Sequence, residues 1–156
     1  MKKSLILLMA VILSAFTACS DDDSKSASTQ NVAFSVPSLN LTAEATPIQI
    51  KFSEATTSAG TLTIDIAVNG VVYGTDFSTN PAAVSNKLVV PFGANVTSVD
   101  FTFNKLIDAI EGQVKNVVFT ISDVSIDANI TGNKLIQVNF NETALLGSSL
   151  AAEVGG

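Results

Sequence analysis

The sequence contains no histidine, no arginine and no tryptophan, and its single cysteine is Cys19. A Ser-His-Asp triad, a Cys-His catalytic pair, a haem site and a structural zinc site need histidine or several cysteines, so all four are excluded. Eight lysines stand against 14 acidic residues, for a net charge of −6. Nucleic acid requires clustered positive charge, and we expect no nucleic-acid partner. The 156 residues suffice for one domain of ordinary size.

Residues 1–18 have the pattern of a signal peptide. Two lysines precede an apolar run from Leu5 to Leu13, which is shorter than the roughly 20 residues of a membrane-spanning helix. Thr17-Ala18-Cys19 resembles the lipobox of bacterial lipoproteins, although Phe16 stands where that family usually has an aliphatic residue. The resemblance implies that a lipid is attached to Cys19 and that the chain is anchored to a membrane. The alternative is an ordinary secretory signal that ends near a cysteine.

An acidic segment follows the cysteine directly. Ser20, Asp21, Asp22 and Asp23 resemble the export tag of Bacteroidetes-type lipoproteins, which implies an outer-membrane lipoprotein displayed on the cell surface. The alternative is a solvated acidic spacer. Residues 19–30 are polar and are expected to form a flexible tether. Removal of residues 1–18 deletes two lysines and changes the net charge from −6 to −8.

Alternating apolar and polar residues predict that residues 31–141 are rich in β-strands. The pattern is clearest at Leu62, Ile64 and Ile66, and at Phe101 and Phe103. Shorter β-branched runs at residues 32–36, 71–73, 88–92, 117–121 and 135–140 add further strands, separated by turn residues. The predicted fold is all-β, an antiparallel sandwich or barrel of seven or eight strands. Residues 142–156 are expected to form a tail, with a short helix as the alternative.

The phenylalanines are predicted to build the core, because most of them lie on alternating strand faces. Each buries roughly 150–250 Å² of surface, which gives the domain a core without disulfides. The six assigned to the core are Phe34, Phe52, Phe101, Phe103, Phe119 and Phe140. A sugar-stacking surface would need exposed aromatics, for which only Tyr73 and Phe77 are candidates.

The order of the motifs resembles the Calx-beta family, an immunoglobulin-like sandwich module of cation exchangers and bacterial surface proteins. The resemblance covers about residues 31–141, and a fibronectin- or cadherin-type sandwich is the alternative. The matching segments are Val32 to Glu44, Gly74-Thr75-Asp76-Phe77, Val90-Pro91-Phe92-Gly93, Val99 to Ile107, Asp108 to Gly112, and Val117 to Ile121.

The Calx-beta resemblance implies calcium ligands at Glu44, Asp76, Asp108 and Glu111, gathered at one end of the sandwich. Calcium needs six to eight oxygen ligands. The loop from Asp108 to Gly112 has fewer carboxylates than the corresponding loop of the family, and Lys105 nearby would repel a cation. Any calcium binding is therefore expected to be weak, with a Kd of about 10⁻⁴–10⁻³ M at best. Each acid also has an ordinary interpretation as a turn cap or a solvated loop residue.

We expect a non-enzymatic, surface-anchored binding or structural module with a protein or glycan ligand and no required cofactor. Its ligand is expected at the loops of residues 71–84 and 108–116, because sandwiches carry function in their end loops. One alternative is a carbohydrate-binding accessory lipoprotein. The other is a small glycoside hydrolase that uses the carboxylate pair Asp108 and Glu111.

Overall fold

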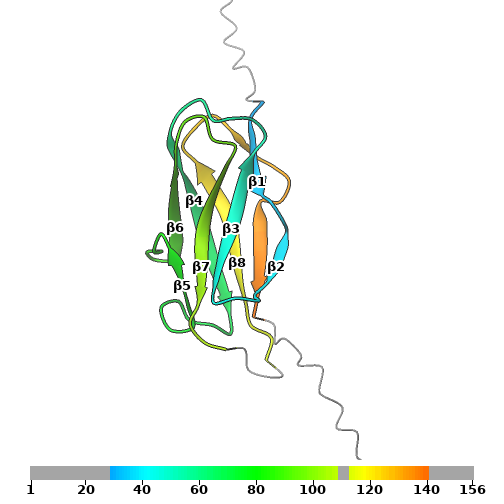
Figure 1. Ribbon diagram of the computed structural model, residues 1–156, viewed down its shortest axis with the longest axis vertical. Coiled ribbons are helices and arrows are strands. Elements are labelled where there is room, and N and C mark those ends of the chain that lie inside the picture. The colour runs from blue at the N-terminus through cyan, green and yellow to red at the C-terminus, as the bar shows by residue number, and fades with distance from the viewer. Residues whose placement is uncertain (1–28, 109–112, 141–156) are drawn as a thin grey trace, which may run out of the picture.

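The computed structural model describes residues 29–108 and 113–140, which form two β-sheets facing each other (Figure 1). In this part of the chain there is no helix, and hence none that is long and apolar enough to cross a membrane. The strands are β1 (Asn31–Phe34), β2 (Ser38–Asn40), β3 (Ala45–Phe52), β4 (Gly60–Asn69), β5 (Phe77–Asn80), β6 (Lys87–Phe92), β7 (Ser98–Lys105), β8 (Asn116–Val124), β9 (Asn129–Ile130) and β10 (Leu135–Asn139).

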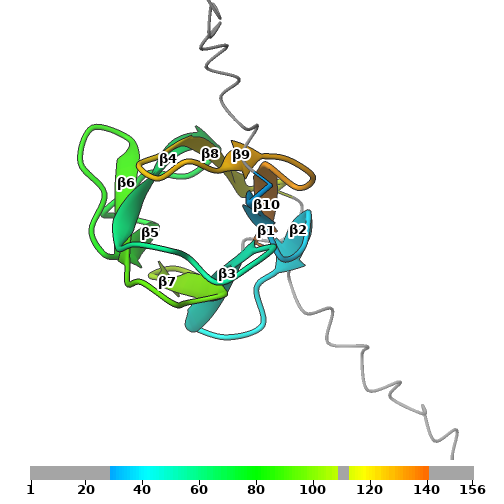
Figure 2. The same cartoon turned by 90° about the horizontal axis from the view of Figure 1, so that it is seen from above.

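The first sheet has the strand order β5-β7-β3-β1-β9, and the second has the order β2-β10-β8-β4-β6. Viewed along the strands, the two sheets enclose one interior (Figure 2). Neighbouring strands are antiparallel except at two edges, where β9 pairs with β1 and β2 pairs with β10 in parallel. The prediction of an all-β, immunoglobulin-like sandwich is confirmed.

Inward-facing residues of both sheets form a single core. Every second residue is buried from Ile48 to Phe52 in β3, from Leu62 to Ile66 in β4 and from Leu88 to Phe92 in β6, as the alternation predicted, whereas Val68 near the end of β4 is 45% exposed. All six phenylalanines assigned to the core are at most 5% exposed. Phe103 stands at the centre of an aromatic cluster, because its ring stacks on Phe77 at 5.1 Å and meets Phe119 and Phe140 edge-on.

Two details of the strand prediction were wrong. The run at residues 71–73 is not a strand, because it lies between Gly70 and Gly74, whose positive φ angles turn the chain at both ends. The described residues hold ten strands and not seven or eight, since β2 and β9 are only three and two residues long. Segments this short carry no readable alternation.

The two ends of the sandwich differ in what they carry. The near pole is where β1 begins and β3 ends, and Asn31 lies there beside Ser53. The far pole is where β2, β4, β7 and β10 end and where β3, β5 and β8 begin. In Figure 1 the near pole is at the top and the far pole at the bottom.

Candidate functional site

Two of the proposed calcium ligands lie on either side of the end of β7 at the far pole. The backbone N–H of Lys105 donates to the Glu44 carbonyl oxygen at 2.7 Å, and that of Leu106 donates to the Asp76 carbonyl oxygen at 2.9 Å. Glu44 immediately precedes β3 and Asp76 immediately precedes β5, the two strands that flank β7. Asp108 follows three residues after β7 ends. The sheet therefore brings three of the four predicted residues to one pole.

The side chains of these three residues have separate environments. Asp76 Oδ2 accepts the backbone N–H of Val72 at 2.8 Å, which is the turn-capping role that was the alternative interpretation. The Asp108 side chain is 98% exposed, and its Oδ1 lies 3.1 Å from Lys105 Nζ. Glu44 is exposed as well. Glu111, the fourth predicted ligand, lies outside the described residues.

In residues 29–108 and 113–140, no group of three or more carboxylates, cysteines or histidines is close enough to hold a metal ion. A cation at Asp108 would also have to displace the ammonium group of Lys105. The calcium ligand set stays a prediction, because Glu111 is not among the described residues.

The Asp108–Glu111 pair of a glycoside hydrolase also stays a prediction, because Glu111 is one of its two carboxylates. Cys19 and the acidic tag, Ser20 to Asp23, likewise lie outside the described part.

Tyr73 has a role that the sequence analysis did not find. It closes the outer edge of β5, where backbone groups face away from β7. Its phenol oxygen accepts the backbone N–H of Ala83 at 2.8 Å and that of Thr79 at 3.4 Å, and it lies 3.1 Å from Thr79 Oγ1. The N–H of Gly74 donates to the Phe77 carbonyl oxygen at 2.7 Å on the same edge. An open strand edge invites pairing with another chain, and this loop covers it.

The hydrogen bonds at Tyr73 also change the acidity of its phenol. Burial raises the pKa, but the hydrogen bonds with the Thr79 hydroxyl and with the backbone N–H groups of Ala83 and Thr79 lower it more. The net pKa of Tyr73 is below its ordinary value of 10.0. The cause is that N–H donors stabilise the phenolate, which is the charged form.

The aromatic pair considered for sugar stacking does not form a surface platform. Phe77 is fully buried between Tyr73 and Phe103, and the Tyr73 ring meets it edge-on at 5.2 Å. Tyr73 is half-buried and its hydroxyl is bonded to its own loop. A glycan-binding role therefore needs another surface.

The outer face of the second sheet carries an ion pair between neighbouring strands. Lys87 of β6 donates to Asp65 of β4, directly opposite it in the register. This hydrogen bond, together with the charge of Lys87, holds the pKa of Asp65 below its ordinary value despite partial desolvation. Because both side chains are about half exposed, the pair is screened by solvent and contributes little to stability.

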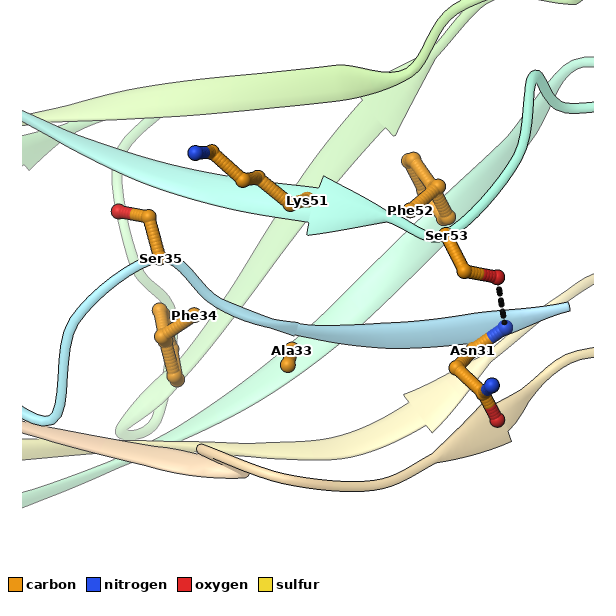
Figure 3. A pocket seen from close by; sticks show the side chains of 7 residues that line it. All are labelled: Asn31, Ala33, Phe34, Ser35, Lys51, Phe52 and Ser53. Carbon is orange, nitrogen blue, oxygen red and sulfur yellow. Dashed lines mark hydrogen bonds between the residues drawn. The ribbon is translucent and has the colours of Figure 1, made fainter.

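A shallow groove of about 360 Å³ lies along β1 and β3 on the outer face of the first sheet (Figure 3). Ala33 forms part of its lining, and its small side chain leaves room between the larger neighbours. Lys51 is the charged residue of the lining, and the N–H of Asn31 donates to Ser53 Oγ at the end toward the near pole. The groove has one cation and few fixed polar groups, so it does not define a ligand.

No known protein family and no characterised protein sequence matches the chain. Solved structures share its fold. The apo form of the Calx CBD1 domain has a TM-score of 0.54 at 11% sequence identity, and the match covers 70% of this chain and 95% of that domain. CBD12 from CALX1.2 has a TM-score of 0.56 at 12% identity, over 70% of this chain and 43% of that chain. The chain has the fold of a Calx-beta domain.

A third similar structure is described as the calcium-binding domain CBD12 of CALX1.1. Its TM-score is 0.55 at 12% identity, over 69% of this chain and 44% of that one. This chain thus spans less than half the length of the two CBD12 structures. The Calx-beta likeness is therefore one of fold.

Proposed function

We propose that the chain is a non-catalytic lipoprotein module, anchored through Cys19 and displayed on the cell surface. The observation that carries this proposal is the arrangement of the two poles. The described chain enters the sandwich at the near pole, where residues 29 and 30 lead into β1. The loops of residues 71–76 and 106–108 lie at the far pole (Figure 1). A lipid on Cys19 would place the near pole toward the membrane and these loops away from it.

The dimensions of the chain fit this orientation. Twelve residues, 19–30, separate the lipid site from β1, and a flexible chain of that length spans roughly 20 Å on average. The eight residues of β3 run between the poles and cover roughly 26 Å. The far-pole loops would therefore stand well outside a lipid surface and be open to large partners.

Weak calcium binding at the far pole is the finer part of the proposal. It is supported by the placement of Glu44 and Asp76 beside the end of β7, and by the description of CBD12 of CALX1.1 as calcium binding. The ion would be held by Glu44, Asp76, Asp108 and Glu111. The pairing of Asp108 with Lys105 is the reason for expecting low affinity.

Site-directed labelling tests the surface display. Val72 is 59% exposed in a far-pole loop, and Ser58 is exposed in a near-pole loop. A Val72→Cys variant, expressed in a bacterium that processes lipoproteins, should react with a membrane-impermeant maleimide in intact cells. Ser58→Cys is the matched control and should react more slowly, because it lies on the membrane side. Reaction of Val72→Cys only after lysis would show that the protein is not displayed on the surface.

A further inference from the structure

Four asparagines from four different strands stand side by side at the far pole of the second sheet. Asn69 of β4 is opposite Asn116 of β8, which is opposite Asn139 of β10, which in turn is beside Asn40 of β2. Neighbouring strands lie about 4.8 Å apart, so the row is roughly 14 Å long. We call these four residues the asparagine row.

All four side chains are on the outer face of the sheet. In β10 the neighbouring Ile136 and Val138 are buried, and strand alternation therefore directs Asn139 outward. The buried Val117 directs Asn116 outward, and the partly buried Leu39 directs Asn40 outward. Asn69 is opposite Asn116 in the register and therefore lies on the same face. Asn40 and Asn69 are exposed, whereas Asn116 and Asn139 are half-buried. All four residues are thus at least partly accessible to solvent.

Hydrogen bonds fix one half of the row and leave the other half open. Gln137 Nε2 donates to Asn139 Oδ1 at 2.7 Å, and Asn139 Nδ2 donates to Asn40 Oδ1 at 3.0 Å. The side-chain amides of Asn69 and Asn116 have no hydrogen-bond partner within the described part of the chain. The surface thus presents oriented amides with free donors and acceptors.

The outward residues next to the row on the sheet are uncharged, and one lysine borders the row. Two positions along each strand from the asparagines, the next outward residues are Ser38, Gln137, Val118 and Ala67, in that order across the strands. Lys115, which precedes Asn116 and lies beside Gly70, borders the row. Apart from Lys115, this surface offers hydrogen bonds without ion pairs, in a chain whose net charge is −6. It suits a neutral ligand that carries many hydroxyl groups.

We propose that the asparagine row binds a neutral polysaccharide that lies across the four strands. A side-chain amide presents a donor and an acceptor side by side, which matches two adjacent hydroxyls of a sugar ring. The repeat of the row, about 4.8 Å, is close to the advance of one sugar along an extended chain, so successive rings meet successive asparagines. The site lies on the second sheet, apart from the calcium candidates on the first.

This inference deepens the proposed function by naming a ligand class for the displayed module. Affinity gel electrophoresis tests it independently of membrane anchoring and calcium. The full mature chain, in a detergent without sugar groups and with EDTA present, is run through native gels. The gels contain hydroxyethyl cellulose, xylan, mannan or a soluble β-1,3-glucan, with anionic polygalacturonate for comparison.

We expect retardation by at least one neutral polymer and none by polygalacturonate. The double variant Asn69→Thr/Asn116→Thr removes two amides from outward strand positions that favour threonine, and should weaken binding about tenfold or more. The matched control, Gln49→Thr/Asn104→Thr, changes two outward amides of the first sheet and should stay within about twofold of the wild type. If the first variant does not fold by circular dichroism, the isosteric Asn69→Asp replaces it.

Three results with the wild type and the asparagine variants would overturn the proposal. They are no retardation in any of the neutral gels, retardation that the asparagine variants leave unchanged, and retardation by polygalacturonate alone. Loss of binding in the control variant alone would move the site to the first sheet and would also contradict it.

Discussion

The phenol oxygen of Tyr73 accepts the backbone N–H of Ala83, ten residues further along the chain, at 2.8 Å. The same oxygen accepts the N–H of Thr79, a residue that is only 5% exposed. One hydroxyl group thus satisfies two backbone donors, and it ties the loop before β5 to the edge of β5 and to the loop after it.

Replacing this hydroxyl should destabilise the domain. Tyr73→Phe keeps the edge-on contact with Phe77 but leaves the N–H groups of Thr79 and Ala83 without their acceptor. The expected loss in the free energy of unfolding is about 1–3 kcal/mol, measured by urea denaturation. Val72→Thr, a change at an exposed neighbour, should have little effect. Equal midpoints for Tyr73→Phe and the wild type would show that the hydroxyl does not support the loop.

Tyr73 is the only tyrosine of the chain, so phenolate absorbance reports on it alone. The folded protein should titrate below pH 10.0, and the urea-unfolded protein near its ordinary value. Because the folded-state pKa is the lower one, the unfolded state binds more protons between the two values, and stability relative to Tyr73→Phe rises with pH there. The gain is complete above the unfolded pKa and lost as the pH falls through the folded one. A folded curve at or above the unfolded curve would contradict the hydrogen-bonding account.

Calcium should raise the melting temperature only slightly. With a Kd of about 10⁻⁴–10⁻³ M, about 10 mM calcium stabilises the folded state by roughly 1.4–2.7 kcal/mol, which is several degrees at this size. Asp108→Asn should reduce the shift, and Asp123→Asn, at an exposed position on β8, should not. Magnesium and EDTA are the comparisons. A calcium-specific shift that saturates in the micromolar range would show a tight site and contradict the expected weak binding.

The sequence predicted the long strands well, because the alternation of apolar and polar residues along a strand indicates which residues face the core. Ile48, Ile50 and Phe52 alternate with polar residues and are buried as expected. A strand was wrongly predicted at residues 71–73 because β-branched residues raise the local strand propensity. Gly70 and Gly74 turn the chain on either side of this run. The parallel pairing of β2 with β10 and that of β9 with β1 join residues far apart in the sequence, so the local sequence carries no signal for either.

The candidate sites were less predictable, because they depend on register between strands. The Calx-beta resemblance implied that Glu44 and Asp76 lie at one end of the sandwich, and in the structure both immediately precede strands next to β7. It did not give the pairing of Asp108 with Lys105. The asparagine row was missed because its members come from four strands, and only the register aligns them. The available signal was that Asn40, Asn69, Asn116 and Asn139 each begin or end a strand.

The central claim, a lipid-anchored module, is tested most directly by the variant Cys19→Ser. Wild-type protein expressed with a radiolabelled fatty acid should carry the label and fractionate with the outer membrane. Cys19→Ser should carry no label and should leave the outer-membrane fraction, because the chain has no second cysteine for the lipid. Ser20→Ala, at the next residue, is the matched control and should stay labelled. A Cys19→Ser protein that remains labelled and membrane-bound would contradict the account.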